Sequence, residues 1–173
     1  DWPIDEQLNL LRPGDVVTYC FHEGPGGIAP DGRVVDSARE ARERGVLFDV
    51  GHGMSSFDFG VAEAAIADGF PPDTISTDFY VRHAHSVPTH DLPRTISKLM
   101  AAGMAEADAL ECATLRPARA LGLEGEVGTL RPGACADLAV LNWDRDAAPL
   151  ADAERTGGCW EPVLTIRGGE VIL

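Results

Sequence analysis

Asp78, a carboxylate that could do chemistry, stands at the end of the short run Asp73–Asp78. A carboxylate at the carboxyl-terminal tip of a buried strand can hold a metal ion or move a proton, and barrel enzymes keep their chemistry at such tips. The earlier apolar run Val46–Val50 has a similar form, because glycine, His52 and glycine follow it. Two such tips in series predict one active-site face.

These polar residues also have plainer interpretations. His52 would face the pocket, where it and Gly53 would contact a substrate or orient a metal ligand, or it is a histidine hydrogen-bonded beside a glycine turn. Asp78 is a catalytic carboxylate, or a helix cap or loop acid in a local Ser-Thr-Asp turn. The glycine-rich segment 24–27 lacks the lysine and hydroxyl residue of a phosphate-binding loop, which favours a turn.

The elements that would position these residues alternate between apolar strand-like runs and helical patterns. This alternation is typical of β/α units that build a parallel sheet, so we predict an α/β fold. The predicted strands are Val16–Phe21, Val46–Val50 and Thr74–Thr77, and the predicted helices are Asp36–Arg44 and a segment that is capped by Ser55 or Ser56 and ends at Gly69.

The pattern changes after Asp78. Asp91 is predicted to cap a helix, a second helix follows, and Pro117 suits the first turn of a short third helix. Helical periodicity is then lost, and we predict a β-rich tail with a hairpin at Gly168-Gly169. The predicted domains are residues 1–122 and 123–173. The expected elements are helices at 92–102, 105–115 and 117–122 and strands at 136–141, 163–167 and 170–173.

Composition excludes some classes of function. The chain has 173 residues, of which 28 are acidic and 14 basic, and its formal charge of −14 argues against binding nucleic acid or anionic membranes. No apolar run approaches the roughly 20 residues of a membrane-spanning helix, and the first residues have no signal-peptide pattern, so we predict a cytoplasmic protein. The four cysteines lack metal-knuckle spacing and are predicted to be core thiols, with Cys159, in a glycine-rich loop, as the one expected to be exposed.

Several segments, in this order, resemble the amidohydrolase superfamily of metal-dependent hydrolases, and within it the dihydroorotase-like deacetylases. The ordered set is more specific than any one motif and covers nearly the whole chain. The segments are Leu11–Phe21, Phe48–Gly53, Asp73–Asp78, Ala113–Ala118 with Leu121–Leu123, and Gly128–Leu138.

The resemblance implies that the predicted strands are the sixth, seventh and eighth of a (β/α)8 barrel. Three units cannot close a barrel of eight strands, so the chain would be its C-terminal part, with the tail forming part of a small β-sandwich. Asp78 would be the eighth-strand ligand of a divalent metal, usually zinc. In the family's mechanism, this aspartate takes a proton from metal-bound water as hydroxide attacks a carbonyl, and passes it to the leaving nitrogen.

The sequence departs from the family in the region of the metal ligands. Tyr19 stands where the family has a histidine ligand, and a neutral phenol is a poor substitute for imidazole at a zinc site. His22 could replace it or be an ordinary surface histidine. His83-Ala-His85 has the His-x-His motif of the ligand pair that the family carries in its first strand, but here it follows the predicted eighth strand. Arg116 replaces an asparagine that is common before Pro117, a change expected to affect local stability.

Two hypotheses follow. In the first, the chain belongs to a hydrolase that acts on a small-molecule amide, such as an N-acyl amino acid or a cyclic amide, with the missing strands supplied by the rest of the protein. In the second, the chain is an inactive half-barrel that serves as a structural or partner-binding module. An uncovered sheet edge makes a lone monomer less favourable, so we predict a homo-oligomer.

Overall fold

The computed structural model describes residues 2–53, 55–86, 90–147 and 157–172. It contains two compact units, residues 1–78 with 102–104 (unit 1) and residues 79–101 with 105–173 (unit 2). The last helix, α6, ends at Ala120 and the next strand, β3, begins at Leu138, so the change from helices to strands falls near the predicted position. The division into domains at residue 122 stays a prediction. None of the described helices is long and apolar enough to cross a membrane.

Unit 1 contains a small parallel arrangement of strands. Strand β1 (Val16–Val17) pairs in parallel with β2 (Leu47–Phe48), and a parallel bridge joins Asp49 to Thr74. The parallel pairing predicted from the alternating pattern is therefore confirmed. The regular strands are shorter than predicted, and the predicted strand Thr74–Thr77 is wrong as a regular strand, since it contributes only the bridge at Thr74. The first strand ends before Tyr19, which has a φ of 62° and leaves the extended conformation.

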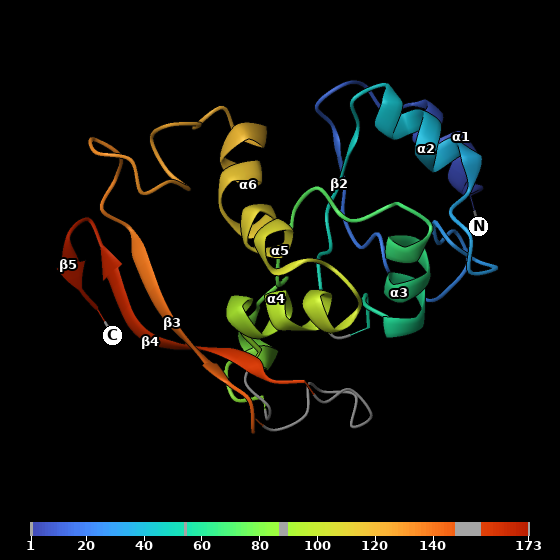
Figure 1. Ribbon diagram of the computed structural model, residues 1–173. Coiled ribbons are helices and arrows are strands. Elements are labelled where there is room, and N and C mark those ends of the chain that lie inside the picture. Colours follow the sequence, from blue (N-terminus) through green and yellow to red (C-terminus); the bar gives the residue numbers. More distant parts are fainter. Residues whose placement is uncertain (1, 54, 87–89, 148–156, 173) are drawn as a thin grey trace. The chain divides into compact units, whose positions relative to one another are not determined.

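The described residues of unit 1 form three helices: α1 (Ile4–Asn9), α2 (Asp36–Glu43) and α3 (Phe59–Ala67). The first two lie side by side (Figure 1). The predicted helix at Asp36 is confirmed, whereas the prediction that Ser55 or Ser56 caps α3 is wrong. Asp58 is the cap, because its carboxylate accepts a hydrogen bond from the Val61 amide at 2.8 Å and carries a negative charge at the positive end of the helix.

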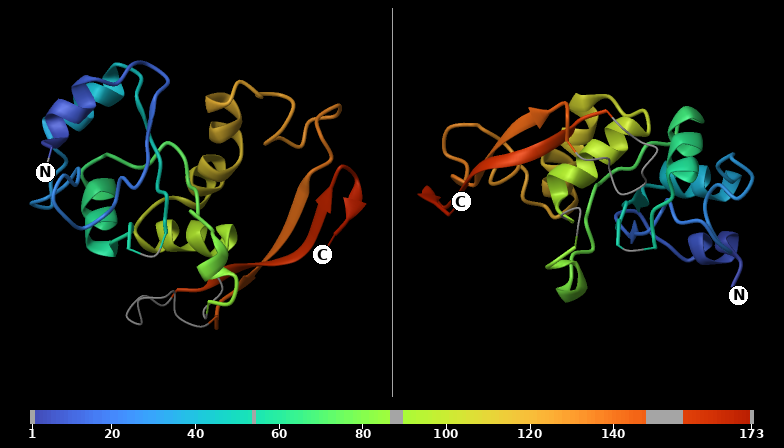
Figure 2. Two further views of the ribbon diagram at one scale, coloured as in Figure 1. Left: turned by 180° about the vertical axis from the view of Figure 1, so that it is seen from behind. Right: turned by 90° about the horizontal axis from the view of Figure 1, so that it is seen from below.

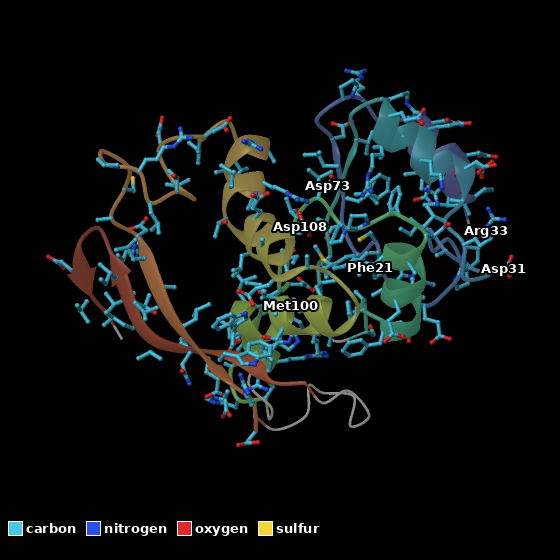
Figure 3. The ribbon with its side chains drawn as sticks, in the orientation of Figure 1. Phe21, Asp31, Arg33, Asp73, Met100 and Asp108 are labelled. Atoms are coloured by element: carbon cyan, nitrogen blue, oxygen red, sulfur yellow. The ribbon has the colours of Figure 1, made fainter. Side chains whose placement is uncertain are left out.

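The core of unit 1 contains aromatic rings among its aliphatic side chains. The rings of Phe48 and Phe70 meet edge to face with 5.0 Å between centroids, and the Arg42 guanidinium lies 3.5 Å from the Phe70 centroid. Phe21 is buried beside α3, and its carbonyl accepts a hydrogen bond from the Asp58 amide (Figure 3). The strands and α3 are thereby fixed to one another at the level of Phe21.

In unit 2, the part of the chain that the structure describes begins with a 3-10 turn, η1 (Val81–His83), and three α-helices follow. They are α4 (Leu92–Ala101), α5 (Glu106–Ala113) and α6 (Leu115–Ala120). The Asp91 carboxylate accepts a hydrogen bond from the Arg94 amide at 2.8 Å, which confirms the predicted cap of α4. Pro117 lies in the first turn of α6, as predicted.

The tail of unit 2 is a three-stranded antiparallel sheet with the order β3 (Leu138–Asp144), β4 (Cys159–Arg167) and β5 (Glu170–Val171). Strands β3 and β4 form a long twisted ribbon (Figure 2). The predicted hairpin is confirmed, because Arg167 pairs with Glu170 across Gly168-Gly169, whose φ values are 57° and 86°.

Candidate functional site

Three segments of unit 1 end next to one another. The loop after β2 pairs with the segment that ends at Asp78. The backbone amide of His52 donates to the carbonyl of Ser76 at 3.0 Å, and the amide of Gly53 donates to the carbonyl of Thr77 at 3.1 Å. On the other side, the amide of Cys20 donates to the carbonyl of Asp49 at 3.2 Å. The pairing brings together the tips that carry Tyr19, His52 and Asp78, which are three of the residues singled out in the sequence.

Tyr19 and Asp78 share an unusual backbone conformation. Their φ values are 62° and 49°, and no other non-glycine residue in the described chain has a positive φ. Aspartate tolerates the left-handed region better than most residues, whereas a bulky tyrosine there is an outlier. Such a conformation costs about 1–3 kcal/mol and persists where the surroundings hold it in place, which is common at functional sites.

Two glycines make room for these residues. A Cβ on Gly51 would lie 2.7 Å from Cδ1 of the Tyr19 ring and 2.2 Å from Oγ1 of Thr18. A Cβ on Gly53 would lie 3.0 Å from Oδ2 of Asp78. The Tyr19 ring and the Asp78 carboxylate therefore both lie against the same three-residue loop, and both glycines have left-handed φ values of 50°.

His52, between these glycines, is held within the fold. Its side chain is buried, its ring stacks on Phe57 with 5.0 Å between centroids, and its Nδ1 lies 2.8 Å from the carbonyl oxygen of Gly53. A carbonyl oxygen only accepts, so Nδ1 carries the proton in this contact. The hydrogen bond matches the interpretation of a histidine beside a glycine turn, while its contact with a substrate stays a prediction.

Asp49 lies beneath the three tips and accepts three hydroxyl hydrogen bonds. Its Oδ2 accepts from Thr18 at 2.9 Å and from Ser76 at 2.6 Å, and its Oδ1 accepts from Thr74 at 2.7 Å. Hydrogen bonds to a charged group contribute about 1.5–3 kcal/mol each, and here they replace the water that the buried carboxylate has lost. Burial, and then the Asp49 carboxylate, raise the pKa of the Cys20 thiol well above its ordinary value.

Sequence reasoning missed Asp49. The sequence does contain a hint, because Asp49 is an acidic residue inside an apolar run and both neighbouring runs contain serine or threonine, at Thr18, Thr74 and Ser76. Parallel pairing brings those hydroxyls to the same level as the carboxylate, but the register has to be known first.

A metal ion implied by the resemblance would need more ligands than this part of the chain provides. Among the described residues, no three His, Cys, Asp or Glu side chains lie close enough together to hold one. Asp78 offers one exposed carboxylate, and Tyr19, which is 39% exposed, offers a phenol beside the same loop. The donor type of Asp78 fits a divalent cation, but the described set is incomplete.

The other candidate histidines have local surroundings of their own. His22 lies near its own glycine-rich loop, since a Cβ on Gly24 would be 3.5 Å from its Nδ1. His83 is buried in unit 2, where its ring stacks on His90 with 3.9 Å between centroids. His83 therefore packs against ring side chains of its own unit, Tyr80 and His90.

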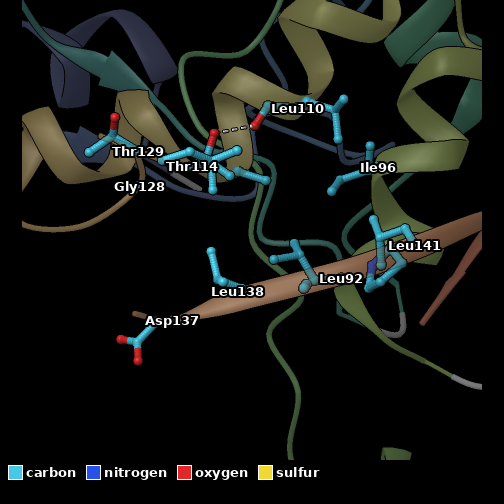
Figure 4. Close-up of a pocket in the computed structure, with 13 residues that line it drawn as sticks. Leu92, Ile96, Leu110, Thr114, Gly128, Thr129, Asp137, Leu138 and Leu141 are labelled. Carbon is cyan, nitrogen blue, oxygen red and sulfur yellow. Dashed lines mark hydrogen bonds between the residues drawn. The ribbon is translucent and has the colours of Figure 1, made fainter. Parts of the chain in front are cut away.

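Unit 2 also contains an apolar cavity of about 470 Å³ between α4, α5 and β3 (Figure 4). Leu92, Ile96 and Leu138 line it, and Asp137 is its one charged lining residue. The Thr114 hydroxyl at its wall donates to the carbonyl of Leu110 at 2.7 Å. This cavity is mostly apolar, whereas the strand tips of unit 1 bring Tyr19, His52 and Asp78 together, so those tips remain the candidate active site.

Residues 54–172 match the model of the amidohydrolase family. The chain belongs to the amidohydrolase family. It is 36% identical to a deacetylase of Enterococcus faecalis, over 97% of this chain and 47% of that protein, and 38% identical to a deacetylase of Agrobacterium fabrum, over 97% and 42%. The family resemblance predicted from the ordered motifs is therefore confirmed.

Solved structures give the same result for this family member. A crystal structure of an adenine deaminase superposes with a TM-score of 0.89 at 35% identity, over 98% of this chain and 48% of that one. A crystal structure of a dihydroorotase superposes with a TM-score of 0.82 at 37% identity, over 98% and 47%. The fold is thus α/β and similar to that of amidohydrolase barrel proteins, and the chain spans about half the length of the relatives it matches.

Proposed function

We propose that the complete protein is a metal-dependent hydrolase that acts on an amide bond of a small molecule, and that this chain supplies its sixth to eighth β/α units and part of a β-sandwich. One observation carries the proposal. The two non-glycine residues with left-handed backbone, Tyr19 and Asp78, lie against one glycine-histidine-glycine loop at the carboxyl ends of parallel strands. This is the end of the strands at which barrel enzymes hold their catalytic groups.

Asp78 has the properties that the reaction requires. Its carboxylate is exposed beside Gly53, and a carboxylate can bind a cation, accept a proton from a water molecule and return it to a leaving nitrogen. A bound divalent cation, which we propose to be zinc, would supply a water molecule of lowered pKa. Asp78 would then be one metal ligand and the proton shuttle, and the rest of the protein would complete the ligand set.

The substrate class is proposed from the relatives. Three relatives that are 36–38% identical to this chain are named deacetylases, and each match extends over 97% of the chain. An N-acetylated small molecule, such as an N-acetyl amino acid, has the amide that this chemistry would cleave. His52 and Gly53 are the proposed substrate contacts, since both lie between Tyr19 and Asp78.

A second candidate function rests on Tyr19. A phenol in place of an imidazole weakens a zinc site, so a protein with this change could survive as a non-catalytic module that self-associates. Under this alternative, Asp78 is an inherited residue without chemistry. Homo-oligomer formation and cytoplasmic location stay predictions of the sequence.

The proposal is tested in the complete protein by zinc content and turnover. Elemental analysis counts the metal per chain, and release of free amine from a panel of N-acetyl amino acids measures hydrolysis. Asp78→Asn is expected to lower kcat/KM by about a thousandfold or more while leaving the melting temperature unchanged, because asparagine tolerates the left-handed backbone. Activity of the variant within a few fold of wild type would exclude Asp78 as the proton shuttle, and a metal-free, inactive wild type would favour the second candidate.

A further inference from the structure

We propose that Asp49 is a positioning residue of this site, whose carboxylate holds Tyr19 and Asp78 in their left-handed conformations through three hydroxyl groups. The inference rests on the proposed function, because it gives Asp78 a reaction to be positioned for. Nothing in the sequence pattern of the strand tips assigns such a role to Asp49.

The geometry links Asp49 to both strained residues. Thr18, which donates to Oδ2 at 2.9 Å, is joined directly to Tyr19. Ser76, which donates to the same oxygen at 2.6 Å, stands two residues before Asp78. One carboxylate oxygen therefore fixes the chain just before each residue whose backbone leaves the extended conformation.

The surroundings of Asp49 favour a fixed geometry of these hydrogen bonds. The residue is 8% exposed, and none of the ion pairs among the described residues involves it. Its charge is therefore compensated by hydroxyl donors, with Thr74 at 2.7 Å on Oδ1 completing the set. A buried carboxylate that lost these donors would be poorly solvated, so the three segments have to stay together.

An amide at this position cannot reproduce the network. A carboxylate presents two acceptor oxygens, whereas asparagine presents one oxygen and one amino group that only donates. At least one of the hydroxyl groups would have to turn and accept. Asp49→Asn is therefore expected to hold Tyr19 and Asp78 less firmly in their left-handed conformations, and Asp49→Ala is expected to release them.

The chain provides a matched control in Asp73. This carboxylate is also partly buried in unit 1 and also joins two segments, because its Oδ2 accepts from the Phe48 amide at 2.8 Å and pairs with Arg42 at 3.2 Å. It contacts neither Tyr19 nor Asp78 in any described hydrogen bond or ion pair. Asp73→Asn should affect stability without affecting the geometry of the tips.

The experiment measures kcat, KM and melting temperature of the complete protein with one N-acetyl amino acid that the wild type hydrolyses. Misplacement of a reacting group by about 1 Å can lower the rate about a hundredfold. We expect Asp49→Ala to lower kcat by about that factor with KM changed less than threefold, Asp49→Asn to lie between it and the wild type, and Asp73→Asn to leave kcat unchanged. Unchanged kcat in both Asp49 variants would overturn the inference.

A second readout does not depend on hydrolysis. In protein labelled with 3-fluorotyrosine, the fluorine resonance of Tyr19 is assigned by its loss in Tyr19→Phe, and its chemical shift reports how the ring lies on Gly51. Asp49→Asn should shift this resonance toward the value of free fluorotyrosine, and Asp73→Asn should not. If the wild type hydrolyses none of the substrates, the proposed function fails and this resonance still decides the inference, because an unmoved resonance overturns it.

Variants that remove one hydroxyl each cover the case in which the Asp49 variants do not fold. Ser76→Ala and Thr74→Val leave the carboxylate in place with two donors. Ser76 shares its carboxylate oxygen with Thr18, so its loss is expected to shift the Tyr19 resonance and to lower kcat about tenfold. Identical resonances and rates in both variants and wild type would overturn the inference.

Discussion

The two ends of the parallel segments in unit 1 satisfy their buried carboxylates in different ways. At the end where the segments begin, Asp73 pairs with Arg42, whose guanidinium lies on the Phe70 ring, and none of these residues has a left-handed backbone. Toward the end where the segments finish, Asp49 has hydroxyl donors and no described ion pair. Two of these donors, Thr18 and Ser76, come just before the strained residues Tyr19 and Asp78 in the chain.

The difference separates stability from function. An ion pair stacked on an aromatic ring stabilises a fold and leaves no group available for chemistry. Burial lowers the pKa of Arg42 below its ordinary value, but a guanidinium stays charged and is a poor proton carrier. The end with Tyr19 and Asp78 differs, because its backbone is strained and its Asp78 carboxylate is exposed. Such strain costs stability and is retained where function requires a fixed geometry.

After Asp78→Asn, the largest effect is expected for Gly51→Ala at the functional end. Its Cβ would meet the Thr18 hydroxyl and the Tyr19 ring, so the tips would have to move apart. We expect kcat to fall by about a hundredfold in a steady-state assay. Gly69→Ala is the control, because Gly69 also has a positive φ of 77° but nothing within 4 Å of the added atom. Equal losses of kcat in both variants would mean that backbone strain alone, and not crowding at the tips, explains the effect.

The next effect is expected for Arg42→Met at the other end. The substitution removes a hydrogen bond to the Pro71 carbonyl and the ion pair with Asp73, and leaves that carboxylate without its cation. We expect the free energy of unfolding to fall by about 2 kcal/mol in urea denaturation, with kcat unchanged. Arg33→Met, on the exposed loop before α2, should change neither quantity. A lower kcat with an unchanged denaturation midpoint would contradict the separation of the two ends.

Tyr19→His should increase the affinity of the functional end for zinc. Histidine tolerates a left-handed backbone better than tyrosine does and is a better zinc ligand. We expect the zinc content of the complete protein, measured by elemental analysis after dialysis, to rise. No increase would mean that Tyr19 does not occupy the ligand position that the family resemblance gives it.

The smallest effect concerns thiol reactivity. Cys135 is exposed, whereas Cys20 and Cys159 are buried and have raised pKa values, mainly because of burial, so the prediction that Cys159 is exposed is wrong. Iodoacetamide should label Cys135 of the native protein and spare the other two, as read by mass spectrometry, and all should react in urea. Rapid native labelling of Cys20 would show that the region around Asp49 opens more readily than the hydrogen bonds indicate.

The sequence predicts the parts of this fold that depend on local pattern. The parallel pairing, the helices that begin after Val35 and Asp91, and the Gly168-Gly169 hairpin follow from periodicity and turn chemistry. The strand lengths do not, because the left-handed backbone of Tyr19 depends on contacts with a loop more than thirty residues away. The Asp58 cap was missed because Ser55 and Ser56 offer competing acceptors nearby.

The residues of the candidate site also differ in whether the sequence alone could select them. Asp78 and His52 could be selected from sequence because each follows an apolar run, and the structure brings their segments together. Asp49 could not be selected, since its three donors come from residues 18, 74 and 76 and meet only once the register of the parallel pairing is known.

The central claim, that one end of these segments serves chemistry and the other stability, is tested most directly by comparing Asp78→Asn with Asp73→Asn in the complete protein. One preparation of each gives kcat/KM on an N-acetyl amino acid and the melting temperature. The account predicts that Asp78→Asn loses turnover at an unchanged melting temperature and that Asp73→Asn keeps turnover at a lowered one. Retained turnover in Asp78→Asn, or lost turnover in a stable Asp73→Asn, would contradict it.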